Sequence, residues 1–212
     1  MIDERTTRLE MSRLCKSLFD RGFSVGTAGN VSVRLPDGML MTPTNVRLGD
    51  LEPERISKLD ANGTHVGGDA PTKEVFLHQA MLDTLPEAGA VVHLHSTWAT
   101  ALSCLSDTNT DDCVPPLTPY VVMRVGPVKL LPYVKPGDPR MGDMIRALNG
   151  QFSAVLLGNH GPVVAGKTLA SAVAAAEELE ETCKLLIALR GLPMRMLSSD
   201  NVAELNATFG RI

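Results

Sequence analysis

The sequence lacks the features that several classes of protein require. Its 212 residues contain no run of lysine and arginine of the kind that follows a phosphate backbone, and the formal net charge is −4. No stretch approaches the ~20 apolar residues of a membrane span. The charged N-terminal segment MIDERTTRLEMSRLCKSLF has no continuous apolar region like that of a secretory signal. We therefore expect a cytoplasmic protein that binds neither nucleic acid nor a membrane.

Two common cofactor and metal motifs are also absent. The four cysteines show no CxxC spacing, so we expect reduced thiols and no zinc knuckle or redox pair, with a catalytic cysteine as the alternative. The glycine-rich segment GTAGN does not supply the GxGxxG of a Rossmann fold. There is no internal repeat or low-complexity linker, and hydrophobic residues make up 44% of the chain. These properties predict one folded domain over residues 1–212.

The hydrophobic pattern predicts strands in hairpin-like groups with helices between them. Helices are expected over residues 3–20, 68–86, 139–149 and 168–189, the second of them starting at Asp69, Pro71 and Thr72. Strands are expected at 31–35, 39–42, 58–68 (a hairpin), 90–95, 119–125, 129–134 and 153–166. Because a regular alternation of single strands and helices is missing, the pattern favours an α/β sandwich with a mainly antiparallel sheet.

Two histidines lie two residues apart in the apolar segment AVVHLH. Side chains on a strand alternate between its faces, so His93 and His95 share one surface while Val92 and Leu94 point to the other. Imidazole is the commonest protein ligand for transition metals. A pair of imidazoles on one strand therefore forms a rigid half of a possible metal site.

His160 is the candidate for a third ligand, because it follows an apolar run in LLGNHGPVV where a strand would end. Three histidines around a metal ion leave a position open for substrate, which is typical of catalytic sites. The alternative is that each histidine is simply satisfied by hydrogen bonds. The HxH pair together with NHG favours the metal, although spacing alone leaves the choice open.

A carboxylate and a set of anion-binding groups accompany these histidines. Glu74 lies at the start of the helix that precedes the HLH strand, where it is either a general acid/base or a partner of the helix dipole. His78 shares its helical face and is expected either to be structural or to support the site residues from behind them. The GTAGN turn with Asn30, the TPTN segment with Thr44 and Asn45, and Thr72 with Lys73 all offer donors to an anion. Each alone is a turn or a cap, but together they predict a phosphorylated substrate.

Five separated segments, GTAGNVSVRLPDG, MTPTN, the Glu74 helix, AVVHLH and NHGPV, resemble the class II aldolase/adducin family across nearly the whole chain. The resemblance implies a three-layer α/β/α sandwich with a mainly antiparallel central sheet. It also implies a homo-oligomer, usually a tetramer, with active sites at the subunit interfaces.

The resemblance further implies roles for individual residues. His93, His95 and His160 would bind Zn²⁺ or another divalent ion such as Mn²⁺ or Co²⁺, and Glu74 would be the acid/base. Tyr120 aligns with a tyrosine that reaches a neighbouring subunit's site. The phosphate pocket would comprise Gly29, Asn30, Thr44, Asn45, Thr72 and Lys73. The fuculose-phosphate aldolase pattern has glycine in place of Asn45 and serines in place of Thr72 and Lys73, so this pocket is expected to be remodelled.

The segments PTKEVFLH, TPYVVMRVG and LLPYVKPGD are most similar to the branch of the family that decarboxylates 3-oxo-tetronate 4-phosphates. The expected reaction gives dihydroxyacetone phosphate and CO₂ through a metal-stabilised enediolate. A sugar-phosphate aldolase of the fuculose type and a ribulose-phosphate 4-epimerase are the alternatives within the same chemistry. A non-catalytic, adducin-like assembly protein is the alternative of another class.

Overall fold

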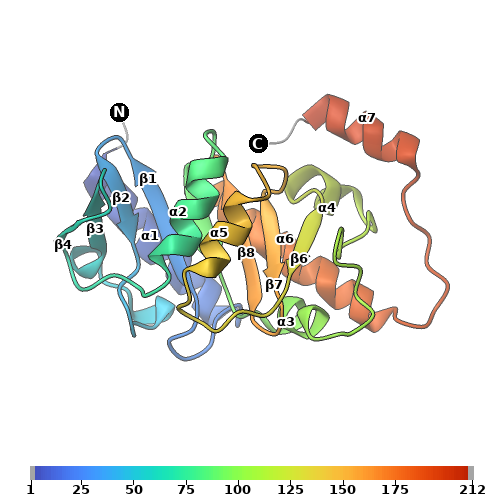
Figure 1. Cartoon of the computed structure of the whole chain (residues 1–212), viewed down its shortest axis with the longest axis horizontal. Helices are drawn as coiled ribbons and strands as arrows, with labels where there is room; N and C mark the ends of the chain where they lie inside the picture. Colours follow the sequence, from blue (N-terminus) through green and yellow to red (C-terminus); the bar gives the residue numbers. More distant parts are fainter. Residues whose placement is uncertain (1–2, 210–212) are drawn as a thin grey trace.

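The computed structural model describes residues 3–209, which are built around one eight-stranded sheet (Figure 1). The strands lie in the order β4-β3-β2-β1-β5-β8-β7-β6. Neighbours are antiparallel except for β6 and β7, which are parallel. Their bounds are β1 Asn30–Leu35, β2 Gly38–Met41, β3 Ser57–Asp60, β4 His65–Gly67, β5 Ala90–His93, β6 Val128–Leu131, β7 Ala154–Leu157 and β8 Gly161–Gly166. The predicted mainly antiparallel sheet is confirmed.

Helices cover both faces of this sheet and give the three layers (Figure 1). One face carries α2 (Val75–Thr84) and α5 (Arg140–Arg146). The other carries α1 (Glu4–Asp20), α3 (Thr97–Ser103), α4 (Pro119–Arg124) and α6 (Leu169–Ala188), with α7 (Ser199–Phe209) packed beside α4. Short 3₁₀ turns span Leu48–Asp50 and Pro53–Arg55. Among residues 3–209, none of the helices combines the length and the apolar character needed to cross a bilayer.

The sheet separates two apolar cores. Val92 and Leu94 pack into the core shared with α1, α3 and α6, whereas Val91 packs into the core beneath α2 and α5. Alternate residues of β5 therefore serve opposite faces, and burial on both faces explains why its sequence is almost continuously apolar. The predicted division, with Val92 and Leu94 away from His93, is observed.

The strand predicted over residues 119–125 is wrong, because this segment forms helix α4. The Thr118 side chain accepts a hydrogen bond from the Val121 amide, and Pro119 occupies the first turn, where its missing N–H costs nothing. Val121 and Val122 are buried on one side of the helix. A cap and a proline at the helix start thus outweigh the strand preference of the β-branched residues.

The helix predicted from residue 68 begins only at Val75, so Asp69, Pro71 and Thr72 are not its first residues. They belong to an extended segment that lies against residues 42–44. Pro43 and Pro71 form an isolated β-bridge, and the Thr44 amide donates to the Ala70 carbonyl at 2.9 Å. This pairing satisfies backbone groups that a longer helix would have used internally.

Candidate active site

The end of β5 is packed closely by the two neighbouring chain segments. In the sheet register, His93 stands opposite Asn30 of β1 and opposite Val163 of β8. A Cβ atom at Gly29 would lie 3.0 Å from the His93 carbonyl oxygen, and one at Gly161 would lie 2.2 Å from the Leu94 carbonyl oxygen. The glycines of AGN and NHG therefore allow the backbone on both sides to approach the histidine strand.

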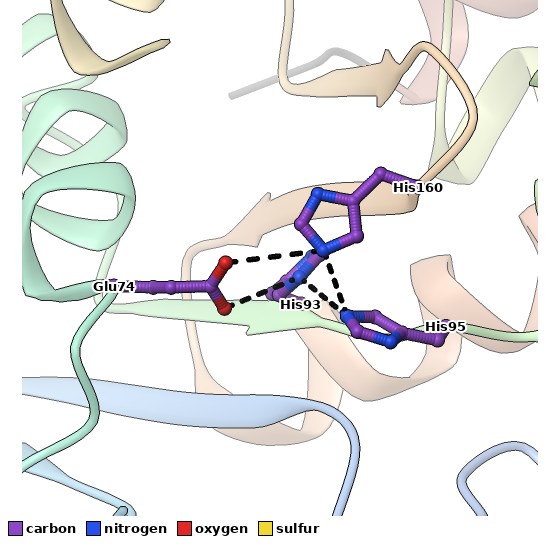
Figure 2. Close-up of side chains that lie close together, drawn as sticks. All are labelled: Glu74, His93, His95 and His160. Carbon is purple, nitrogen blue, oxygen red and sulfur yellow. Dashed lines mark hydrogen bonds and ion pairs between the residues drawn. The ribbon is translucent and has the colours of Figure 1, made fainter. Parts of the chain in front are cut away.

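Glu74, His93, His95 and His160 converge from three parts of the chain, as Figure 2 shows. One ligand atom from each residue can be chosen so that all four lie within 4.8 Å of one another. The Nε2 atom of His95 is 3.1 Å from that of His93 and 2.9 Å from that of His160. The Glu74 carboxylate oxygens lie 3.5 Å from His93 Nε2 and 3.8 Å from His160 Nε2.

The tautomer of His93 is fixed by its backbone neighbour. Its Nδ1–H donates to the Pro162 carbonyl at 2.8 Å, which leaves the lone pair of Nε2 facing the group. Burial lowers the pKa of His93 to about 3, and burial also lowers the pKa values of His95 and His160. All three rings are therefore neutral near pH 7, which is the form that binds metal ions.

The spacing of the donor atoms fits a metal ion. Two nitrogens that are each ~2.0–2.1 Å from a tetrahedral ion lie roughly 3.3–3.4 Å apart. The observed separations of 3.1 and 2.9 Å are close to this distance. Three neutral imidazoles with one carboxylate form a donor set suited to divalent transition metals. The group could therefore hold a divalent metal ion.

A buried chain of hydrogen bonds holds the Glu74 side chain. Asn30 donates its amide N–H to Glu74 Oε2 at 2.9 Å, and its amide oxygen accepts from His78 Nε2. The Nδ1 atom of His78 then accepts from the Ser32 hydroxyl at 2.8 Å. Burial lowers the pKa of His78 to about 4, so this ring is neutral and has one donor and one acceptor, as the chain requires. The predicted structural histidine thus lies two hydrogen bonds from Glu74.

Glu74 itself occupies the N-cap position of α2, but its side chain makes no capping hydrogen bond and points to the histidines instead. Burial raises the pKa of the Glu74 carboxyl. The electrostatic interaction with the neighbouring imidazoles and the hydrogen bond from Asn30 lower it by more, so the net pKa is below its ordinary value. The carboxylate is ionised at neutral pH and can act as a ligand or a base.

The sequence matches the family described as Class II Aldolase and Adducin N-terminal domain over residues 9–187. The chain belongs to this family. A protein of Escherichia coli named 3-oxo-tetronate 4-phosphate decarboxylase is 49% identical over 205 residues, which cover 96% of this chain and 97% of that protein.

Two further similar proteins bear on the site. YgbL of Escherichia coli is described by three alternative activities, aldolase, epimerase and decarboxylase. Its solved structure matches this chain with a TM-score of 0.92 and 48% identity, over 95% of this chain and 98% of that one. The L-fuculose phosphate aldolase of Escherichia coli is 33% identical over 93% of this chain and 87% of its own length. The decarboxylase is therefore the closer of the two named enzymes.

The three segments predicted to bind phosphate lie side by side in this class II aldolase/adducin chain. Thr42 and Val31 exchange two hydrogen bonds of 3.0 and 3.1 Å, and the Thr72 amide donates to the Thr42 carbonyl at 3.3 Å. These contacts bring together the segments that contain the predicted residues, namely Gly29, Asn30, Thr44, Asn45, Thr72 and Lys73. Phosphate binding by them stays a prediction.

One of the residues predicted to bind phosphate, Asn30, already has hydrogen-bond partners in the site. Asn30 is 6% exposed, and its side chain already uses one amide N–H for Glu74 and the amide oxygen for His78. Lys73 and Asn45 are exposed. Asn45 has a φ of 59°, a left-handed conformation that asparagine adopts more readily than most residues.

Tyr120 is not near the other site residues within one chain. It lies on α4, whose buried residues belong to the core on the sheet face opposite α2, and 54% of Tyr120 is exposed. Its ring is 5.6 Å from the Arg124 guanidinium. A role at an active site would require a neighbouring subunit, as the family resemblance implies, and it stays a prediction.

Sequence reasoning missed the loop that follows β6. A small cavity beside Glu74 and His160 is lined by Val134, Lys135 and Gly137. In the sequence, this loop enters only through the similarity of LLPYVKPGD to the decarboxylase branch, because nothing in its spacing connects it with the histidines. The available signal in the sequence was a lysine between a valine and a Pro-Gly turn.

Proposed function

We propose that the protein is a divalent-metal-dependent carboxy-lyase that converts 3-oxo-tetronate 4-phosphate to dihydroxyacetone phosphate and CO₂. The observation that carries this proposal is the Glu74 carboxylate held against three neutral imidazoles. It occurs in a chain 49% identical, over nearly its full length, to a protein named for this reaction.

The proposed metal ligands are His93, His95 and His160, with Zn²⁺, Mn²⁺ or Co²⁺ as the ion. A bound divalent ion would supply Lewis-acid stabilisation for the negative charge that develops when a 3-oxo acid loses CO₂. The chain contributes by keeping all three imidazoles neutral through burial and by directing His93 Nε2 inward through the Pro162 carbonyl.

Glu74 is the proposed proton donor and acceptor. Departure of CO₂ leaves an electron pair on the neighbouring carbon, which needs one proton to become the hydroxymethyl group of dihydroxyacetone phosphate. The Glu74 carboxylate takes up a proton from solvent, delivers it to this carbon and so returns to its ionised form. Asn30 holds one carboxylate oxygen, so the side chain keeps a fixed orientation through this exchange.

The proposed phosphate pocket combines backbone amides with one cation. The backbone amides of Gly29 and Asn45 can face an anion, and the Thr44 hydroxyl can add a donor, since the Thr44 amide itself is bonded to the Ala70 carbonyl. The exposed Lys73 adds a positive charge next to Glu74. These groups adjoin the donor set described above, so a phosphate bound there would place the other end of a four-carbon substrate near the histidines.

Aldol cleavage of a sugar phosphate is the second candidate function, because the chain is 33% identical to an L-fuculose phosphate aldolase. The test is to compare kcat/KM for 3-oxo-tetronate 4-phosphate and L-fuculose 1-phosphate in the Zn²⁺-loaded protein, with dihydroxyacetone phosphate measured enzymatically. We expect the oxo acid to be preferred by at least about 100-fold. A higher kcat/KM for the ketose phosphate would contradict the proposal.

We further propose that the protein is a cytoplasmic homotetramer. Large apolar side chains are exposed on the segment after α6 and at the end of α7, which supports burial against another subunit: Leu192, Met194, Met196 and Phe209. Light scattering on the purified protein should give a mass close to four chains.

A further inference from the structure

Glu180 is a buried carboxylate outside the group of Glu74 and the histidines. It lies on α6, is 6% exposed, and reaches the start of α3. Its two oxygens accept hydrogen bonds from the backbone amides of Trp98 and Ala99, each at 2.8 Å. Both amides belong to the first turn of α3, where N–H groups have no partner within the helix.

The residue that would normally satisfy these amides does not do so. Ser96 is the N-cap of α3, yet its side chain makes no capping hydrogen bond. Its hydroxyl oxygen is buried and lacks a hydrogen-bond partner within the described part of the chain. Glu180 therefore caps α3 from a different helix, and its negative charge is favourable at the positive end of the helix dipole.

Helix α3 is connected to two of the three histidines. His95 directly precedes Ser96, and the Thr100 hydroxyl donates to the His160 carbonyl at 3.0 Å. The His95 ring contacts the other two rings but has no further hydrogen bond among residues 3–209. Pro162 orients the His93 ring, whereas the position of His95 depends on the backbone that leads into α3.

We propose that Glu180 is a positioning residue for the metal site. By fixing the first turn of α3, it holds His95, and through Thr100 also His160, at the separation that a metal ion requires. The inference rests on the proposed metal site and is independent of whether the substrate loses CO₂ or is cleaved. Outer residues that orient metal ligands typically change metal affinity by about 10–100-fold when removed.

Trp98 provides a built-in reporter, because it is the only tryptophan and its amide is one of the two bound by Glu180. We would titrate Zn²⁺ against a competing chelator and follow Trp98 fluorescence in the wild type, in Glu180→Gln and in Glu181→Gln. The last is a matched control, since Glu181 lies one residue along α6 with its side chain 59% exposed. Glutamine keeps one acceptor but places an N–H group against a backbone N–H.

Glu180→Gln should bind Zn²⁺ about 10–100-fold more weakly and show greater quenching of Trp98 by acrylamide, while the control stays within twofold of the wild type. A lower melting temperature with unchanged Zn²⁺ affinity would show a merely structural role and overturn the proposal.

Thr100→Val provides a second test if Glu180→Gln does not fold. This variant loses the hydrogen bond to the His160 carbonyl, and it should also weaken Zn²⁺ binding. Unchanged Zn²⁺ affinity of Thr100→Val would equally overturn the proposal.

The proposed reaction can fail separately from this inference. Wild-type protein that binds Zn²⁺ but releases no CO₂ would contradict the proposed reaction and would leave the positioning role of Glu180 unaffected.

Discussion

At the scale of single residues, Glu74 and His93 make separable contributions. Glu74→Gln removes the carboxyl group that transfers the proton but keeps the three imidazoles, so the protein should retain bound metal while kcat falls by about 10²–10⁴-fold. His93→Ala should lose both metal and turnover, because His93 is fully buried and directs Nε2 into the group. Metal content by mass spectrometry and initial rates measure both effects. Full activity of Glu74→Gln would disprove the proton-transfer role.

His78 makes stability depend on pH. Burial lowers its pKa from 6.5 to about 4, so below pH 6.5 the unfolded chain binds a proton that the folded chain does not. The free energy of unfolding should therefore fall as pH decreases from 6.5 towards 4. This single group contributes at most about 1.4 kcal/mol per pH unit.

Urea unfolding of the metal-free protein between pH 7 and 5 measures this dependence. His78→Gln should show a shallower decline, while His65→Gln, which changes an exposed histidine of β4, should follow the wild type. Equal slopes for the wild type and His78→Gln would exclude His78 as a source of the effect. His93 contributes with the same sign, so a residual slope is expected in every variant.

At the scale of elements, local patterns predicted most of the fold and missed what depends on distant contacts. The strand of AVVHLH, the turn at NHG and the long helix α6 follow from periodicity and turn residues. The start of α2 could not be predicted, because it depends on the pairing of residues 70–72 with residues 42–44. The capping of α3 by Glu180 could not be predicted from the sequence either, since Glu180 and Trp98 are 82 positions apart.

Helix α4 illustrates the limit of strand propensity, and its cap can be tested. Thr118→Ala removes the hydroxyl that accepts from the Val121 amide, so the free energy of unfolding should fall by about 1 kcal/mol. Thr110→Ala, at an exposed position, should change it by less than about 0.5 kcal/mol. Chemical denaturation of both variants measures the difference. Equal stabilities would show that the Thr118 cap does not stabilise α4.

At the scale of the whole molecule, the helices that carry Glu74 and Tyr120, α2 and α4, pack on opposite faces of the sheet. If the protein is a tetramer with shared sites, Tyr120 from one subunit can complete the site of another. The family resemblance points to this residue, whose proposed contact lies between subunits.

Subunit complementation tests this arrangement. Glu74→Gln and Tyr120→Phe should each lower activity in homogeneous tetramers. Co-expression of the two should restore part of it, because a hybrid interface can pair an intact Glu74 with an intact Tyr120 from another chain. If the mixture has only the weighted mean activity of the two homogeneous variants, Tyr120 does not complete the active site of another subunit.

The central claim is that this site releases CO₂ from a phosphorylated 3-oxo acid. The most direct measurement supplies Zn²⁺-loaded protein with 3-oxo-tetronate 4-phosphate labelled with ¹³C at the carboxyl carbon and follows the label by NMR. We predict that the label appears as CO₂ and bicarbonate with an equal amount of unlabelled dihydroxyacetone phosphate. Label that stays in the organic substrate while metal is bound would contradict the claim.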